Sequence, residues 1–240
     1  MTTDNPPFLS SILILDKPEG LTSMDVCRRI RRRLVNAGAP KRVKVGHGGT
    51  LDPLATGVLV ILVGKATKRC NEIMDGPKRY IAAVDLSCFS TTDDREGEQA
   101  PVQIDTHPTL EHVRAACEQF TGTIQQTPPI YSAMKVGGKR AYKLARAGET
   151  PKMEPRPVTI HSIDIISYDF PIATLDIHCG KGTYIRSLAR DLGKALHTGG
   201  MLTALRRTAV EPFTIEQAIT LEDIPDVLSK EELEGLAVGG

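Results

Sequence analysis

Asp52 stands in a glycine-rich stretch, Gly46 to Gly57, whose composition suits nucleophilic chemistry. Four glycines in twelve residues let the backbone pass close to a ligand or to another part of the chain. Pro53 disfavours the helical conformation for Asp52 and holds it extended. A carboxylate fixed on such a loop, ahead of a buried strand, is well placed to act as a nucleophile. The alternative is an ordinary Asp-Pro turn, and the local pattern favours neither.

A guanidinium that could serve this carboxylate follows the turn at Gly180 and Gly182. Thr183 is expected to cap a helix, which places Arg186 in the first helical turn. Because the helix dipole disfavours a cation there, we expect a compensating anion, either Asp52 or a phosphate. Beside Asp52, Arg186 would favour the ionised carboxylate and position it through a bidentate pair. The alternative is an ordinary surface arginine.

Tyr80 enters a predicted strand directly after Lys78 and Arg79. An aromatic ring beside two cations is suited to stacking on a nucleobase, since every base offers a π-face. The chain has five Tyr, five Phe and no Trp, so an aromatic residue in this setting stands out. A tyrosine on an edge strand with charged neighbours fits the local pattern equally well.

Several other chemistries lack their motifs. No phosphate-binding G-x-x-x-x-G-K-[ST] loop is found, and a dinucleotide fingerprint breaks at Leu51. There is no G-x-S-x-G elbow, and no second carboxylate has a setting comparable to that of Asp52, as a glycosidase would require. The six histidines lack an H-x-x-x-H pair, so no metal is expected, and no cofactor is expected either.

The five cysteines are irregularly spaced and contain no C-x-x-C motif. They argue against a disulfide framework and a zinc knuckle, so a reducing cytoplasm is expected. The longest apolar run, Val58 to Val63, is far shorter than the ~20 residues that span a bilayer, and no membrane association is expected. Met1 to Pro7 shows no signal-peptide pattern.

The net charge of +1 hides a strong segregation of charge. Eight basic and no acidic residues fall in 28–44, seven basic and two acidic in 135–156, and six basic and one acidic in 181–207. Acidic residues concentrate in 93–98 and 211–240. A single basic run is usually a solvated helix surface, but three runs on one face would predict contact with a nucleic-acid backbone.

The elements that must position these residues follow from hydrophobic periodicity. Strands are expected at 11–15, 58–63, 79–86, 158–167, 173–179 and 201–208. Helices are expected at 23–35, after a capping box of Thr22 and Asp25, at 65–74, 110–120, 141–147 and 184–196, and in the acidic C-terminal segment. Residues 87–108 are expected to form a loop. Because strands and helices mix without strict βαβ alternation, we expect an α+β fold with a largely antiparallel sheet.

Four motifs occur in a fixed order along the chain. They are Lys17-Pro18-x-Gly20-x-Thr22-Ser23, the Gly46 to Gly57 stretch, Lys78-x-Tyr80, and Gly180-x-Gly182-Thr183-Tyr184-Ile185-Arg186. Together they resemble the TruB family, the bacterial tRNA pseudouridine-55 synthases. The resemblance extends from about Ile12 to Phe213, and Pro128 to Lys135 is similar to the family's RNA-gripping insertion.

The resemblance implies catalytic roles for three residues. Asp52 matches the catalytic aspartate, and Arg186 matches the arginine that pairs with it. Tyr80 matches the tyrosine that stacks on the target uracil and is a candidate for proton transfer.

It also implies substrate-binding and supporting roles for five further residues. Tyr184 and Leu205 match positions that line the pocket. His47 matches a histidine that stacks in the tRNA T-loop where the flipped base had been. Lys17, with the proline after it, matches a motif that has a structural role near the site, and Lys78 is a further RNA-binding candidate.

The resemblance implies a pseudouridine synthase fold, with a mixed, mostly antiparallel central sheet, flanking helices and an inserted basic RNA-gripping segment at about 125–154. We expect a catalytic domain at 8–220 and an acidic tail at 221–240, without the small RNA-binding PUA domain that many bacterial members carry. The expected partner is the T-stem-loop of tRNA, and the protein is expected to be a monomer.

The implied reaction converts uridine 55 of tRNA to pseudouridine. The base leaves its stack, the C1′–N1 bond breaks, the uracil rotates, and a C1′–C5 bond forms. Asp52 would either attack C1′ or assist a route through a glycal. The competing hypothesis is a non-catalytic RNA-binding or tRNA-folding module that uses the same basic face and has no special need for Asp52.

Overall fold

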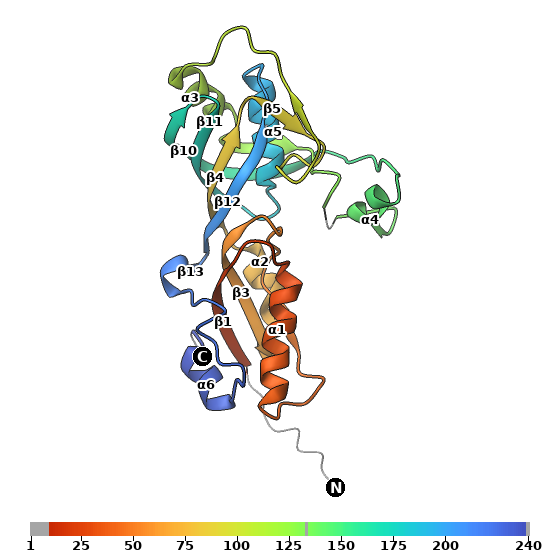
Figure 1. Ribbon diagram of the computed structural model, residues 1–240, viewed down its shortest axis with the longest axis vertical. Coiled ribbons are helices and arrows are strands. Elements are labelled where there is room, and N and C mark those ends of the chain that lie inside the picture. The colour runs from red at the N-terminus through yellow and green to blue at the C-terminus, as the bar shows by residue number, and fades with distance from the viewer. Residues whose placement is uncertain (1–9, 133, 239–240) are drawn as a thin grey trace. The chain divides into compact units, whose positions relative to one another are not determined.

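The computed structural model describes residues 10–132 and 134–238, which form two compact units (Figure 1). Unit 1 comprises Met1–Lys78 and Arg206–Gly240, and unit 2 comprises Arg79–Leu205. Met1 to Pro7, where the sequence shows no signal-peptide pattern, lies outside the described residues. Ala133 of the expected insertion lies outside them as well.

Unit 1 is built on strands in the order β1-β3-β12. β1 (Ser10–Lys17) and β3 (Thr56–Gly64) pair antiparallel over their whole lengths, and β3 pairs in parallel with β12 (Met201–Val210). The other elements of this unit are α1 (Ser23–Asn36), β2 (Val45–His47), the 3₁₀-helix η1 (Lys65–Arg69), α2 (Cys70–Asp75), β13 (Phe213–Thr214), the 3₁₀-helix η2 (Ile215–Gln217) and α6 (Lys230–Leu236).

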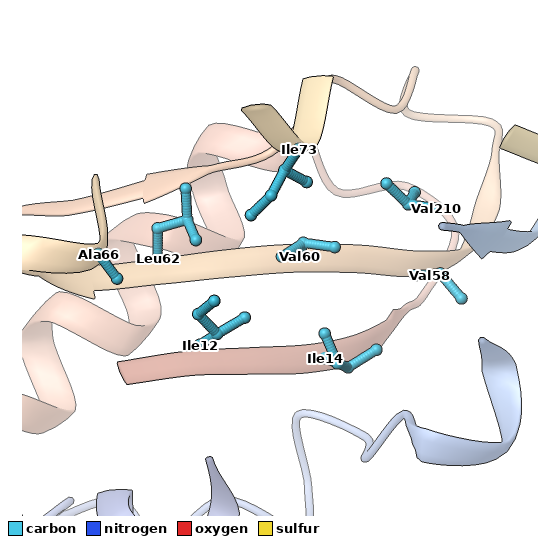
Figure 2. Packing of buried hydrophobic residues seen from close by; sticks show 8 residues of the cluster. All are labelled: Ile12, Ile14, Val58, Val60, Leu62, Ala66, Ile73 and Val210. Atoms are coloured by element: carbon cyan, nitrogen blue, oxygen red, sulfur yellow. The ribbon is translucent and has the colours of Figure 1, made fainter. Parts of the chain in front are cut away.

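A hydrophobic cluster joins the elements of unit 1. Figure 2 shows side chains from β1, β3, α2 and β12 lying together in this cluster. Its buried members are Ile12, Ile14, Val58, Val60, Leu62, Ala66, Ile73 and Val210. Because β3 is buried along almost its whole length, the near-continuous apolar run seen in the sequence is that of a central strand.

Helix α1 forms where local signals agree. The Thr22 hydroxyl accepts a hydrogen bond from the backbone amide of Asp25, and the Thr22 amide donates one to the Asp25 carboxylate, which is the predicted capping box. Val26, Ile30 and Leu34 follow at helical spacing and are fully buried. The predicted helix is therefore confirmed, and its N-terminus is fixed within unit 1.

The acidic C-terminal segment packs onto the core of unit 1. The backbone amides of Ile219 and Val238 donate to the carbonyls of Ile14 and Ile12, at 3.0 and 2.9 Å. Leu228 and Leu233 are fully buried, and the side chains of Leu221 and Ile224 are each 2% exposed. The predicted helix in this segment is α6, and the segment completes unit 1.

Unit 2 has strands in the order β12-β4-β11-β10-β7. β7 and β11 each pair antiparallel with β10, so the expected α+β fold with a mostly antiparallel sheet is confirmed. Its elements are β4 (Lys78–Asp85), β5 (Cys88–Ser90), β6 (Gln99–Pro101), α3 (Leu110–Gln119), β7 (Gly122–Gln126), β8 (Lys135–Val136), β9 (Lys139–Arg140), α4 (Ala141–Arg146), β10 (Arg156–Asp169), β11 (Ile172–Cys179) and α5 (Ile185–Ala195). In the described ranges, no helix has the length and apolar character needed to cross a bilayer.

A basic segment, residues 127–155, leaves the sheet of unit 2 and returns to it. Gln126 at the end of β7 and Arg156 at the start of β10 are register partners, so the segment begins and ends at one place on the sheet. It carries the hairpin β8-β9 and α4, and Figure 1 shows α4 apart from strands β4, β10 and β11. We call residues 127–155 the basic segment.

Two expectations about local structure were wrong. Residues 87–108 are not only loop, because β5 and β6 pair antiparallel within them. The pairing was not predictable because β6 has the sequence Gln-Ala-Pro, which carries no strand pattern. The predicted helix at 65–74 begins instead as the 3₁₀-helix η1 and continues as α2.

Candidate active site

The Asp52 loop, residues 46–57, is fixed to the start of α1 by Ser23. The Ser23 hydroxyl accepts a hydrogen bond from the amide of Leu51 at 2.8 Å and donates one to its carbonyl at 3.1 Å. Ser23 and Leu51 are both buried, and Asp52 is half-buried. One hydroxyl therefore satisfies both backbone groups of the residue that precedes the candidate nucleophile.

The residue that follows Asp52 is fixed by the turn after β1. The Lys17 ammonium is fully buried and donates to the carbonyls of Pro18, Leu21 and Pro53, at 2.8, 2.8 and 3.3 Å. The amide of Gly20 donates to the same Pro53 carbonyl at 2.8 Å. Burial lowers the pKa of Lys17 to about 8, and the negative charge of Asp52 opposes that shift. The Lys17 to Ser23 motif thus holds the Asp52 loop on both sides of the carboxylate.

His47 ends β2 at the entrance of the Asp52 loop. Its ring is half-buried, and its Nδ1 atom has no hydrogen-bond partner among the described residues. Burial lowers the pKa of His47, and the positive charge of Arg207 lowers it further. The imidazole is therefore neutral near pH 7, a state suited to stacking on a base.

Lys78 lies at the junction of α2 and β4. Its buried ammonium donates to the carbonyls of Met74, at 2.5 Å, and Gly76 at the end of α2. A cation stabilises a helix C-terminus because carbonyl groups there are unsatisfied. These contacts give Lys78 a structural role, and its contact with RNA stays a prediction.

In unit 2, Arg186 lies at the centre of a buried polar network. Its guanidinium donates to the carbonyls of Thr92 and Tyr131, at 3.1 and 2.9 Å, and lies 3.3 Å from a carboxylate oxygen of Asp94. Arg186 and Asp94 are 6% and 2% exposed. Asp94 therefore places a negative charge beside Arg186 near the start of α5, whereas the sequence analysis expected Asp52 or a phosphate there and placed Asp94 in a loop.

The next turn of α5 extends this network to the basic segment. Arg190 pairs with Asp93 at 2.7 Å and donates to the carbonyl of Thr127 at 2.9 Å. The hydroxyl of Ser187 donates to the same carbonyl at 2.9 Å. α5 therefore holds both the 91–94 loop and the start of the basic segment.

The start of α5 differs from the prediction in its cap. The N-cap is Tyr184, not Thr183, whose hydroxyl donates to the carbonyl of Gly180. Gln126 fixes the backbone of this N-cap residue, because its side chain accepts from the amide of Tyr184 at 2.8 Å and donates to its carbonyl at 3.1 Å. The guanidinium of Arg156 lies 5.1 Å from the centre of the Tyr184 ring, within range of a cation–π contact.

The remaining candidates lie on two strands of unit 2. Tyr80 on β4 and Leu205 on β12 are each 8% exposed. Unit 2 thus holds Tyr80, Tyr184, Arg186 and Leu205, and unit 1 holds Lys17, His47, Asp52 and Lys78. The pairing of Arg186 with Asp52 joins residues of both units and stays a prediction.

Sequence reasoning did not identify Asp94 and Gln126, which contact candidates of unit 2, or Arg207, which contacts the Asp52 loop in unit 1. The acidic run at 93–98 was noticed in the sequence, but the anion expected beside Arg186 was Asp52 or a phosphate. No local signal marked Gln126. Within the described part of the chain, no group of three or more His, Cys, Asp or Glu side chains is arranged to hold a metal ion.

Comparisons with known proteins agree on one family. A family model described as "TruB family pseudouridylate synthase (N terminal domain)" matches residues 32–185, and one described as "tRNA pseudouridylate synthase B C-terminal domain" matches residues 186–237. The relative from Arthrobacter sp. (strain FB24), named tRNA pseudouridine synthase B, is 48% identical over 94% of this chain and 74% of its own. The relative of the same name from Phocaeicola vulgatus is 43% identical over 93% of this chain and 95% of its own.

A solved structure is also similar over most of the chain. It is described as "Crystal Structure of a Cbf5-Nop10-Gar1 Complex", and the matching chain has a TM-score of 0.68 and 27% sequence identity. The match covers 92% of this chain and 59% of that chain.

Proposed function

Since the chain belongs to the TruB family of pseudouridylate synthases, we propose that it converts uridine 55 in the T-loop of tRNA to pseudouridine. The relatives named tRNA pseudouridine synthase B support tRNA as the substrate. The observation that carries the proposal is the setting of Asp52, a carboxylate between two residues whose backbones are held by Ser23 and Lys17.

The reaction is an isomerisation in which no atom is gained or lost. The target uridine first leaves its stack, at a cost of a few kcal/mol. The C1′–N1 bond breaks, the uracil turns, and C1′ bonds to C5, whose proton leaves while N1 gains one. Asp52 acts at C1′, either as the nucleophile or as the group that assists a glycal route. A carboxylate on a fixed backbone serves either route, because no loop must be ordered during the reaction.

The other candidates take the roles that the family resemblance implies. Tyr80 stacks on the uracil and is the candidate for proton transfer, and Tyr184 and Leu205 line the pocket. His47 stacks in the space that the flipped base leaves in the T-loop, which its neutral ring favours. Arg186 pairs with Asp52 in the proposed mechanism.

Recognition of the T-stem-loop is assigned to the basic segment and to exposed cations elsewhere. Phosphate contacts position the RNA, and contacts in the pocket select the base. We propose that the protein acts as a monomer in the cytoplasm, and the five free cysteines support a reducing compartment.

The test is to incubate the protein with an unmodified tRNA transcript and to map pseudouridine by carbodiimide treatment and primer extension. We expect one new stop, one nucleotide 3′ of position 55, and none in a control transcript that carries cytidine at position 55. RNA binding without any stop would instead favour a non-catalytic binding or folding module.

A further inference from the structure

Arg207 is a buried cation that the sequence motifs do not assign to any role. Its side chain lies on β12 in unit 1 and is 1% exposed. The guanidinium donates three hydrogen bonds, all to backbone carbonyls: to Val58 at 2.8 Å, Gly49 at 3.0 Å and Thr50 at 3.3 Å. Among the described residues, no carboxylate forms an ion pair with it. Burying a full charge is unfavourable unless its hydrogen bonds are satisfied, so these three bonds are what make the position tenable.

The three acceptors lie on both sides of Asp52 in the sequence. Gly49 and Thr50 belong to the loop shortly before Asp52, and Val58 is a fully buried residue of β3 directly after the loop. One rigid, planar group therefore ties the part of the loop before Asp52 to the strand that follows the loop. Ser23 and Lys17 bond to Leu51 and Pro53, the residues on each side of Asp52. Arg207 bonds to the backbone of Gly49 and Thr50, which come before Leu51.

Two glycines permit this arrangement for different reasons. At Gly57, which has φ +99° and pairs in register with Arg207, a Cβ atom would collide with the Arg207 backbone. At Gly49 a Cβ atom would lie at an ordinary contact distance of 3.6 Å from Arg207, but its φ of +122° is one that L side chains rarely adopt. The glycine-rich character of the loop is thus explained in part by the approach of β12 and not only by access for a ligand.

The electrostatics connect Arg207 to Asp52. Arg207 and Lys17 are two buried cations near each other, since the charge of Arg207 disfavours the charged form of Lys17. The charge of Asp52 has the opposite effect on Lys17, so the carboxylate offsets the repulsion between the two cations. Glu19 acts on Lys17 in the same direction as Asp52, so acidic and basic charges balance around the buried ammonium that holds the loop.

We propose that Arg207 is a positioning residue for the isomerisation, an inference that rests on the proposed function. It fixes the backbone of Gly49 and Thr50, and through it the direction in which Asp52 presents its carboxylate to the sugar. A misplacement of about 1 Å at a reacting group lowers a rate by about 100-fold. Substrate affinity should not depend on it to the same degree, because the side chain is buried and cannot reach RNA.

The test compares Arg207→Lys with the wild-type protein. Lysine keeps the charge, but its single nitrogen cannot reach all three carbonyls. With enzyme in excess over a tRNA transcript, we expect the single-turnover rate to fall by about 10- to 100-fold, while the Kd for the transcript changes by less than about threefold. Gly49→Ala strains the backbone that Arg207 holds, because Gly49 has φ +122°, and with Arg207 in place we expect a loss of rate in the same direction.

Two controls separate positioning from stability. Arg69→Lys removes an exposed guanidinium of the same unit that pairs with Glu72, and it should leave the rate unchanged. Ile12→Val weakens the core cluster without touching the loop, and its rate below the melting temperature should match the wild type. A wild-type rate for Arg207→Lys would overturn the inference, and so would a loss of rate that the change in Kd explains in full. The inference would also fail if Ile12→Val, with the same melting temperature as Arg207→Lys, lost as much rate. If Arg207→Lys does not fold, Gly49→Ala decides by the same criteria. Inactivity of the wild-type protein on the transcript would instead overturn the proposed function.

Discussion

The Asp52 loop and the basic segment are held in opposite ways. In the loop, Leu51 and Pro53 are bonded to distant parts of unit 1, and Leu54 and Ala55 are buried. The basic segment is tied at its base, where Thr127 and Tyr131 accept hydrogen bonds from side chains of α5. Beyond that base it carries short elements, a hairpin of two-residue strands and the six-residue helix α4.

The difference matches two different demands on the molecule. Chemistry at C1′ requires a carboxylate in one place, because misplacement is costly to the rate. Phosphate contacts act through charge over several ångströms and tolerate adjustment of the chain that makes them. We therefore expect changes in the loop to lower the reaction rate, and changes in the basic segment to weaken binding.

Among the supporting residues, the largest effect is expected at Arg186, because it contacts both the 91–94 loop and the base of the basic segment. Arg186→Ala removes the donors to Thr92 and Tyr131 and leaves the buried Asp94 without this cation. We expect the single-turnover rate to fall by about 100-fold or more and stability to fall by about 3–5 kcal/mol.

Stability in urea and the rate with excess enzyme check this prediction. As a control, Arg79→Ala breaks an exposed pair with Asp176 in the same unit and should change stability by less than about 1 kcal/mol. An unchanged rate for Arg186→Ala would remove the role proposed for the guanidinium.

Neighbouring residues at the start of α1 test the loop itself. Ser23→Ala removes both hydrogen bonds to Leu51. We expect the free energy of unfolding to fall by about 1–3 kcal/mol and the single-turnover rate to fall by about tenfold. Thr22→Ala removes the helix cap, which should lower the free energy of unfolding by about 1 kcal/mol. It removes none of the hydrogen bonds to the loop described above. Equal rates for the two variants would contradict the view that Ser23 positions Asp52.

The basic segment is tested by reversing two exposed charges, in the double variant Lys139→Glu, Arg140→Glu. If both contact phosphates, the slope of log K against log salt becomes less steep by about 1.5, and the Kd rises by about 10-fold at moderate salt. The rate at saturating enzyme should stay at the wild-type value. Binding titrations at several salt concentrations measure both quantities.

A matched control reverses two exposed charges of unit 1, Arg69→Glu and Lys230→Glu, with the same change of net charge. It should leave the salt slope nearly unchanged. An equal effect of the two double variants would mean that RNA responds to net charge and not to the basic segment.

The smallest effect concerns the protonation of Lys17. Its pKa is about 8 in the folded protein and has an ordinary value of 10.5 when unfolded. Between these values the unfolded chain binds more protons, so folding becomes more favourable as pH rises from about 8 towards 10.5. Relative to Lys17→Met, the free energy of unfolding of the wild-type protein should increase by on the order of 1 kcal/mol over this pH range. Urea unfolding at pH 7.5 and at about 10 measures the difference, and a relative loss would contradict the assigned shift.

Sequence predicted those parts of the fold that depend on neighbours in the chain. α1 was predicted because its capping box and its apolar spacing are both local, and β3 because its run of apolar residues is uninterrupted. The start of α5 was misplaced because the side chain that fixes Tyr184 is Gln126, 58 positions away. The pairing of β5 with β6 was missed because the sequence of β6, Gln-Ala-Pro, carries no strand pattern.

The candidate site shows the same division. Asp52 and Arg186 were predicted from local composition and the order of the motifs. The contacts that hold Asp52 were not, because Ser23 lies 28 positions from Leu51 and Lys17 lies 36 positions from Pro53. The motif that begins at Lys17 was noticeable in the sequence, but only the fold shows that it supports the Asp52 loop.

One measurement tests the central claim most directly, that a fixed carboxylate at Asp52 carries the reaction. The variant Asp52→Asn keeps the shape of the side chain, and its pseudouridine formation at position 55 is followed under single-turnover conditions beside its Kd for the transcript. We predict a Kd within about threefold of the wild type and a rate lower by about a thousandfold or more. Turnover within tenfold of the wild-type rate would contradict the account.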